Sequence, residues 1–270
     1  ESIAFDTRNF PEGAGKLLAL ATAVEPLKQD PEPEQSWLTA VNPLVLLKNA
    51  LARLKESLAF TGEVSIALVR MVTGRSNTRF EDFRQFCFEG GPSALGIISL
   101  TSVLVGMILA YLGAAQLQQF GAEVYVANLV TIGILREMGV LMTAVVMAGR
   151  TGAAYAAQLG TMQTNEEIDA ITTLGISPVE FLVLPRLLAL VCVMPLLTLY
   201  ANLLGIIGGG IVAGGMGITP LQFLNQAEEA LAVNHLLAGL IKSVIFALLI
   251  AVAGCRAGIN SGRSSAAVGQ

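Results

Sequence analysis

Two adjacent charged residues, Arg136 and Glu137, interrupt an apolar helical pattern that covers residues 124–160. If this helix enters a bilayer near Val124, Glu137 lies about 20 Å deep at ~1.5 Å per residue. A charge at that depth costs on the order of 2.5–3.5 kcal/mol, so it needs a wet cavity, a partner or a proton. Adjacent helical residues do not face each other, so the two side chains should line a polar interior. The pattern predicts a path for a polar group; a purely structural charge network is the other interpretation.

No catalytic motif accompanies these charges. The sequence has no GxxxxGK[ST] that would cradle ATP phosphates, and no HExxH, GxSxG or CxxC. His235 is the only histidine, and Cys87, Cys192 and Cys255 lie far apart in or near apolar segments. Such cysteines are typical of buried thiols rather than of a disulfide or metal framework. We therefore expect no enzyme active site, metal or cofactor on this chain.

The elements that must position the charges are membrane helices. Hydrophobic residues make up 54% of the chain and charged residues only 13%, whereas a soluble domain carries about a quarter charged residues. The helix over residues 124–160 would be about 55 Å long, beyond the ~30 Å hydrocarbon core, so one end should project into water. The apolar runs predict four transmembrane helices, at residues 93–116, 124–160, 181–213 and 236–256.

The basic residues predict how these helices are oriented. Lysine and arginine cluster before the first span, within residues 150–186 and after the last span. The two intervening loops, residues 116–123 and 213–235, have none. By the positive-inside rule, the N-terminus and the segment between the second and third spans face the cytoplasm.

That cytoplasmic segment predicts a short helix at residues 165–174. Thr164 and Glu167 have the T-x-x-E spacing of a capping box, and Gly175 and Pro178 should end the helix. So short a helix cannot bury an apolar face alone, so we expect a surface for docking, with an inert connector as the alternative. The expected apolar face holds Ile168, Ile171 and Leu174, and the acids Glu166, Glu167 and Asp169 project elsewhere.

Small residues recur every four positions along the same long helix. They allow the backbone of another helix to approach closely, in a symmetric copy of the chain or simply within one chain. The predicted span 181–213 repeats the pattern. The residues are Ala144, Ala148, Gly152, Ala156 and Gly160, and then Gly205, Gly209 and Ala213.

The residues before the first span fall into three parts. Residues 1–25 have the composition of a small soluble remnant, and residues 26–43 are rich in proline and acid, which is typical of a linker. Over residues 44–72, leucines recur at steps of three and four with charges off that stripe. This predicts an amphipathic helix in the membrane interface, with a coiled-coil seam as the alternative.

The run LREMGVLMTAVVMAGRTGAAYAAQLGTMQTNEEIDAITTLGISPVEFLVLPRLLA, with LIKSVIFA later, resembles the MlaE-type (YrbE) permeases. These are membrane subunits of ABC lipid transporters that work with MCE proteins. The resemblance covers residues 44–270, the permease domain, and implies an all-α membrane fold with a fifth span beyond residue 270. Glu167 stands where the family often has glutamine. Residues 1–25 resemble the end of a STAS domain, which some members carry in front of the permease.

The resemblance implies a transporter subunit without its own ATPase site. Two copies of the chain would form a homodimer. The homodimer would assemble with an ABC ATPase subunit, which binds ATP and Mg, and with an MCE-domain (MlaD-like) protein. A STAS-domain interaction is a further expectation. Phospholipid would move between the inner membrane and the MCE conduit, supporting outer-membrane lipid asymmetry. The chain would be a multi-pass protein of the bacterial inner membrane with a cytoplasmic N-terminus. The residues that the resemblance implies for the lipid pathway are Arg136, Glu137, Val140 and Thr143. Those implied for the ATPase-coupling helix are Glu166, Glu167, Ile168, Asp169, Ile171 and Leu174. Those implied for close helix packing are Ala148, Gly152, Ala156 and Gly160.

Two other functions fit the residues. Glu137 could serve as the proton or cation site of a secondary transporter, or the chain could be a membrane scaffold that anchors a STAS-like domain. Nothing in the sequence points to nucleic acid.

Overall fold

The computed structural model describes residues 43–73 and 80–261. The chain divides into two units, residues 1–54 and 55–270, and the first contributes only the start of helix α3 (Pro43–Val72) to the described part. The STAS-like remnant and nearly all of the predicted linker lie outside the described residues and stay predictions. In the described ranges every regular element is a helix.

Four helical segments of the second unit are long and apolar enough to cross a membrane, which confirms an all-α membrane protein. The first is longer than predicted because α4 (Phe80–Gly90) continues through a short turn into α5 (Leu95–Leu117). The last corresponds to α12 (Val233–Ile259). The four segments are Phe80–Phe120, Glu123–Thr164, Val179–Gly215 and Val233–Ile259.

The second segment is one helical rod with two π turns, which the apolar pattern does not predict. A π turn holds an extra residue, so it rotates the side chains that follow relative to a regular α-helix. The successive pieces are α6 (Val126–Gly133), η4 (Ile134–Met138), α7 (Gly139–Met147), η5 (Ala148–Gly152) and α8 (Ala153–Thr164).

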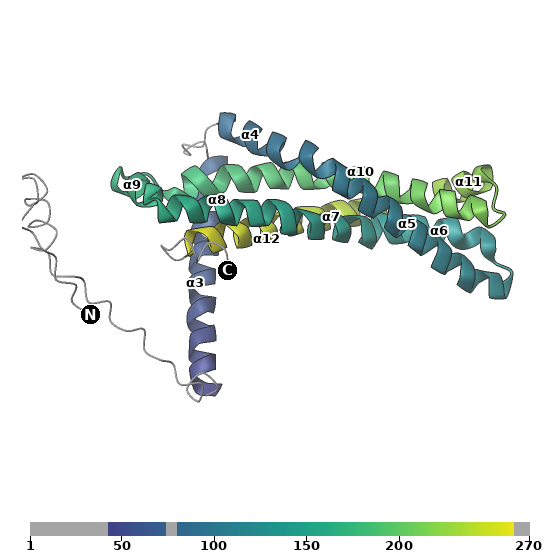
Figure 1. The fold of residues 1–270 in the computed structure, drawn as a ribbon, viewed down its shortest axis with the longest axis horizontal. Helices are drawn as coiled ribbons and strands as arrows, with labels where there is room; N and C mark the ends of the chain where they lie inside the picture. The colour runs from purple at the N-terminus through teal and green to yellow at the C-terminus, as the bar shows by residue number, and fades with distance from the viewer. Residues whose placement is uncertain (1–42, 74–79, 262–270) are drawn as a thin grey trace, which may run out of the picture. The chain divides into compact units, whose positions relative to one another are not determined.

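Helix α10 (Leu184–Gly215) is the most buried of the four. In its most apolar stretch 67% of the residues are buried, against 22% in the first and last segments. It crosses α5 with backbone against backbone, because a Cβ on Gly106 would overlap the Gly205 carbonyl and one on Gly208 would overlap the Val103 carbonyl. Figure 1 shows α5 crossing α10 at an angle.

Helices α8 and α12 also meet through small residues. A Cβ on Gly254 would lie 2.7 Å from the Gly152 carbonyl oxygen, and one on Gly258 would lie 2.7 Å from that of Ala156. Gly160 is buried as well, whereas Ala148 is exposed. The small residues around Gly152 therefore serve a contact within the chain, and the π turn at η5 places Ala148 off that contact.

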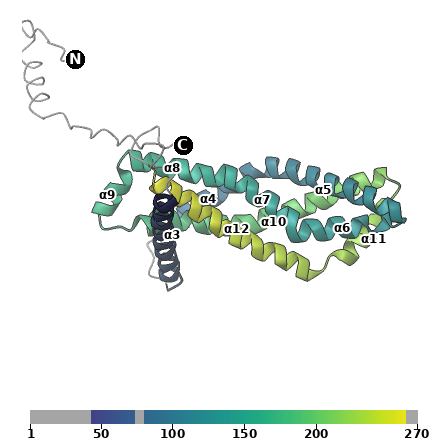
Figure 2. The same ribbon diagram turned by 90° about the horizontal axis from the view of Figure 1, so that it is seen from below.

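The loop predicted at residues 213–235 contains a further helix, α11 (Pro220–Ala230). It begins with a capping box in which Thr219 and Gln222 bond each other's backbone N–H groups. Phe223 and Ala227 are buried in a cluster with α6 residues. In both Figure 1 and Figure 2, α11 lies at one end of the bundle and α9 (Glu167–Thr173) at the other.

Candidate functional site

A cluster of three charges lies partway along the rod, in η4 and on the facing α12. Lys242 Nζ lies 2.5 Å from Glu137 Oε1 and donates to the Arg136 carbonyl oxygen at 3.3 Å. Arg136 Nε lies 3.8 Å from the same Glu137 oxygen. Glu137 is thus shared by two cations, and the cluster carries one net positive charge.

The cluster is accessible from outside the single chain. The side chains of Arg136, Glu137 and Lys242 are 55%, 45% and 38% exposed. Glu137 lies 14 residues after the start of the segment at Glu123, which corresponds to about 21 Å of helix and hence to hydrocarbon depth. Charges at that depth are costly beside lipid tails, so this face of α12 and η4 must meet water, a polar ligand or another chain.

Lys242 is a residue of the charged cluster that the sequence analysis did not single out. It is the only charged residue between Leu236 and Ala253, within an otherwise apolar span. The criterion that singled out Arg136 and Glu137 applies to it equally, since a lone charge in a span usually has a partner. What the sequence could not supply is the partner, because residues 137 and 242 meet only in the folded bundle.

Two other residues of the expected lipid pathway lie elsewhere. Val140 and Thr143 are fully buried, and the Thr143 hydroxyl donates to the Gly139 carbonyl at 2.8 Å. The structure therefore does not bring them to the accessible face that holds Arg136 and Glu137. The physical reason is that residues three and six positions after Glu137 follow the π turn and face the bundle interior.

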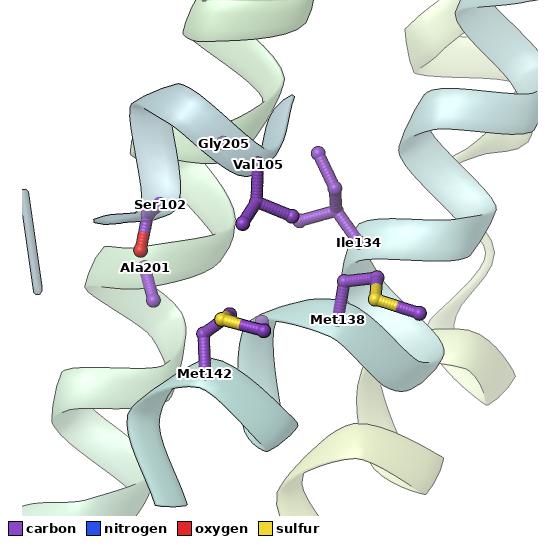
Figure 3. Close-up of a pocket in the computed structure, with 8 residues that line it drawn as sticks. Ser102, Val105, Ile134, Met138, Met142, Ala201 and Gly205 are labelled. Carbon is purple, nitrogen blue, oxygen red and sulfur yellow. The ribbon is translucent and has the colours of Figure 1, made fainter. Parts of the chain in front are cut away.

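A narrow cleft adjoins η4 on that interior side, as Figure 3 shows. Its walls come from α5, α10 and the rod, with Met138 and Met142 across from Ser102 and Ala201. Its volume of about 10 Å³ is enough for one water molecule and far too small for a lipid. A lipid therefore does not fit into this cleft.

Helix α9 has a different start from the one the sequence predicts. Thr164 belongs to α8, and its hydroxyl donates to the Gly160 carbonyl at 2.9 Å rather than capping α9. Glu166 precedes α9 in a left-handed conformation, with φ of 59°. The predicted capping box is therefore wrong, whereas Gly175, with φ of 77°, follows the end of α9 as expected.

The apolar face of α9 is largely used inside the chain. Ile168 is buried and Ile171 packs against the same core, while Leu174 is 76% exposed. Two of the three apolar residues thus contact the core of the same chain, which leaves Leu174 as the exposed apolar residue for docking. The outward surface of this end presents Leu174 together with the exposed Glu166 and Glu167; Asp169 is half-buried.

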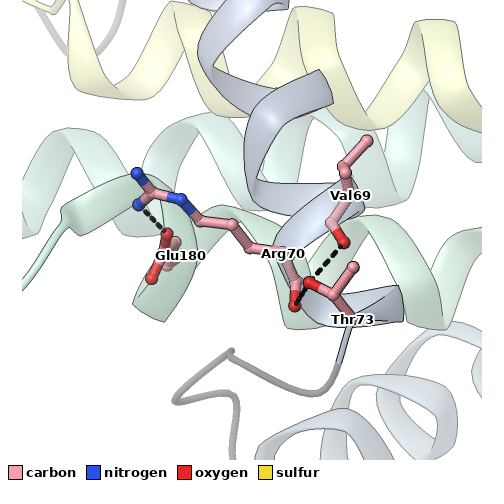
Figure 4. A network of polar contacts seen from close by, with 4 residues as sticks. All are labelled: Val69, Arg70, Thr73 and Glu180. Atoms are coloured by element: carbon pink, nitrogen blue, oxygen red, sulfur yellow. Dashed lines mark hydrogen bonds and ion pairs between the residues drawn. The ribbon is translucent and has the colours of Figure 1, made fainter.

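An ion pair joins the segment after α9 to the end of α3. Arg70 Nη1 donates to Glu180 Oε1 at 2.7 Å, and Glu180 belongs to the π turn η6 (Val179–Val183) that begins the third span. Figure 4 shows this pair beside Thr73, whose hydroxyl donates to the carbonyls of Val69 and Arg70. The end of α3 is therefore linked to the start of the third span, which follows α9 directly in the chain.

Four apolar spans, a charged cluster at hydrocarbon depth and an exposed helix at one end define a multi-pass membrane protein with a polar membrane site. A family model for the permease MlaE matches residues 83–270, and the chain belongs to this family. A probable ABC transporter permease protein of Synechocystis, slr1045, is 31% identical over 219 residues, which cover 81% of each chain.

Two further relatives agree. A probable ABC transporter permease protein of Rickettsia typhi, RT0041, is 33% identical over 192 residues, covering 69% of this chain and 72% of the relative. The chloroplastic protein TRIGALACTOSYLDIACYLGLYCEROL 1 of Arabidopsis thaliana is 31% identical over 67% of this chain and 52% of its own. The chain is thus an ABC transporter permease subunit, which implies a partner that hydrolyses ATP.

Proposed function

We propose that this permease moves phospholipid along the face that carries Arg136, Glu137 and Lys242, between two copies of the chain. The observation that carries the proposal is a cluster with net positive charge, 38–55% exposed, at hydrocarbon depth. A phospholipid phosphate is anionic and matches arginine and lysine donors. The cleft beside η4 on the interior side holds only about 10 Å³, which favours a path on the outer face.

A second copy supplies a physical reason for charges on that face. A C2 dimer apposes the same patch from both chains, so two such clusters would enclose a polar cavity within the bilayer. That arrangement removes the cost of charged groups facing lipid tails. The name of the chloroplastic relative is that of a galactosylated diacylglycerol, and this agrees with a lipid cargo.

The partners in this proposal are placed by charge and exposure. The ABC ATPase subunit, which binds ATP and Mg, docks at the end that holds α9, where Leu174 and Glu167 face outward. The MCE-domain protein sits at the α11 end, and lipid passes between it and the membrane. The chain lies in a bacterial inner membrane with its N-terminus in the cytoplasm, because the basic residues gather at the α9 end.

The contacts of Glu137 disfavour a secondary transporter. A proton or cation site needs a carboxylate that can change partners, whereas Glu137 is shared by Lys242 and Arg136. The Lys242 ammonium group, 2.5 Å from Glu137 Oε1, already serves as a counter-ion of this carboxylate. The cluster as a whole is therefore better suited to an anion than to a cation.

Reconstitution tests the proposal. The permease, its ATPase and its MCE partner are placed in liposomes, and transfer of a fluorescent phospholipid to acceptor vesicles is followed with and without ATP. Arg136→Gln and Lys242→Gln should each reduce ATP-dependent transfer roughly tenfold, since each removes a charged donor. Arg84→Gln, at an exposed position of α4, is the matched control and should transfer normally. Transport driven by a pH gradient without ATPase would instead support the secondary transporter.

A further inference from the structure

A second basic site lies further along the rod, at Arg150 in η5. Arg150 follows Arg136 by 14 residues, which corresponds to about 21 Å of helix. It follows the start of the segment at Glu123 by 27 residues, about 40 Å, so it lies beyond a ~30 Å hydrocarbon core and within the headgroup layer. This is the end of the bundle that holds α9.

Arg150 lines a pocket of about 230 Å³ between the end of α4 and the rod, which we call the Arg150 pocket. Arg150 Nη1 is buried and has no hydrogen-bond partner among the described residues. Within the same described ranges no carboxylate lies within ion-pair distance of the Arg150 guanidinium. A buried guanidinium nitrogen without a partner is costly, so an acceptor should complete it. The lining residues are Glu89, Gly90, Arg150, Thr151, Ala154, Tyr155 and Gln158.

A second guanidinium supports the pocket from behind. Arg186 is buried, donates through Nη1 to the Leu182 carbonyl at 2.7 Å, and lies 4.5 Å from the centre of the Phe86 ring. Its Nη2 donates to Gln158 Oε1 at 3.5 Å. With its oxygen toward Arg186, Gln158 retains its amide N–H₂ group as a donor at a position that lines the pocket.

Among the described residues that line the pocket, Glu89 is the single acid, and it is exposed. Glu89 Oε1 accepts from Gln85 Nε2 at 2.8 Å along α4. With Arg150 in the wall, Arg186 behind it and one carboxylate at the edge, the formal charge around the pocket is one positive. A cationic pocket with amide and guanidinium donors selects an anion with several acceptor oxygens.

We propose that the Arg150 pocket binds a phosphate group, with the guanidinium of Arg150 and the amide of Gln158 as its donors. The pocket's depth admits two sources of that group, the headgroup of a membrane phospholipid and free inorganic phosphate. The site lies about 21 Å along the rod from the Arg136 cluster, and it holds its ligand whether or not that cluster carries lipid.

The test uses the full chain with the Arg136 cluster silenced by Arg136→Gln and Lys242→Gln, so that lipid bound there does not contribute. After delipidation in detergent, phosphatidylglycerol binding is measured by native mass spectrometry and inorganic phosphate binding by calorimetry. Adding Arg150→Gln should weaken binding roughly tenfold, because a charge-assisted donor is lost. Gln158→Glu, at an exposed position, should weaken it as well by placing a competing carboxylate beside both arginines.

Arg84→Gln in the same background is the matched control and should bind as the background does. Loss of both ligands in the Arg150 variant assigns the pocket to phosphate in general, and loss of phosphate binding with lipid binding unaffected assigns it to the free anion. If Arg150→Gln binds both ligands like the control, or if diacylglycerol, which lacks phosphate, binds as well as phosphatidylglycerol, the site is not a phosphate site.

Discussion

Glu137 is held between two cations, and the sequence predicted only part of that arrangement. Charges inside an apolar run are visible without a structure, so Arg136 and Glu137 could be found by inspection, and Lys242 by the same criterion. The ion pair between Glu137 and Lys242 could not be predicted, because the two residues are far apart in sequence. The apolar pattern predicts each span separately and does not indicate which spans pack against each other. Val140 and Thr143, which the resemblance implied for the lipid pathway, are buried in the single chain because they follow the π turn at η4.

The shared carboxylate leads to an unequal pair of variants. Glu137→Gln leaves Arg136 and Lys242 as neighbouring cations without an acid, whereas Lys242→Gln leaves the Arg136–Glu137 contact at 3.8 Å. We expect the first to lower the free energy of unfolding by about 1 kcal/mol more than the second, which is the scale of half-exposed ion pairs. Thermal unfolding in detergent measures the order, with Glu228→Gln on α11 as a neutral control. Equal losses, or a larger loss for Lys242→Gln, would show that Glu137 is not shared.

The sequence predicted the long apolar helices well. It predicted the short helices and their ends poorly, because tertiary contacts determine where these helices lie. The four spans are visible in the sequence because a helix that crosses a bilayer needs about 20 consecutive apolar residues. Helix α11 was missed because its short amphipathic pattern lies within a polar loop, although Thr219 and Gln222 carry a capping-box spacing. The capping box predicted at Thr164 failed because that residue continues α8 instead.

The crossing of α5 and α10 depends on Gly106. A methyl group there would overlap the Gly205 carbonyl, and neither backbone can move without separating the helices. We expect Gly106→Ala to destabilise the protein by about 2 kcal/mol, the usual cost of overpacking. Gly96→Ala is the matched control on the same helix, because nothing lies within 4 Å of its added methyl. That change should be neutral or stabilising by up to ~1 kcal/mol, since alanine favours helix. Similar unfolding midpoints for the two variants would contradict a close crossing.

Helix α9 and the residue after it differ in exposure, with Ile168 in the core of the chain and Leu174 on the surface. Ile168 is buried, so Ile168→Ala should lower the free energy of unfolding by about 2 kcal/mol or more. Leu174 is 76% exposed, so Leu174→Ala should leave the unfolding midpoint unchanged while reducing co-purification with the ATPase and ATP-driven transport. Tagged pull-down and thermal unfolding of the same preparations give both readouts. Normal ATPase binding by the Leu174 variant would place the docking surface elsewhere.

At the scale of the whole molecule, basic residues distinguish the two ends of the bundle. The α9 end carries Arg70, Arg150 and Arg256 beside its acids, whereas the loops of the α11 end, residues 116–123 and 213–235, contain acids and no lysine or arginine. This separation was readable from the loops alone, because the positive-inside rule needs only the positions of spans and of basic residues. The association of two chains could not be read in this way, because small residues around Gly152 suit a partner chain and α12 equally, and the structure places them against α12.

The separation predicts opposite exposure of α9 and α11 in a living cell. The variants Thr173→Cys in α9 and Glu229→Cys in α11 introduce cysteines at exposed positions. Both are made in a background in which Cys87 and Cys192 are changed to alanine and the buried Cys255 is kept. A membrane-impermeant maleimide should label the Glu229→Cys variant in intact spheroplasts, and the Thr173→Cys variant only in inverted vesicles. This outcome is expected from the proposed orientation, in which the end rich in arginine lies in the cytoplasm together with the ATPase. Labelling of both variants from one side would mean that the α9 and α11 ends share a compartment. Labelling with the sides exchanged would place α9 out of reach of any cytoplasmic ATPase, and the coupling role proposed for Leu174 would fail with it.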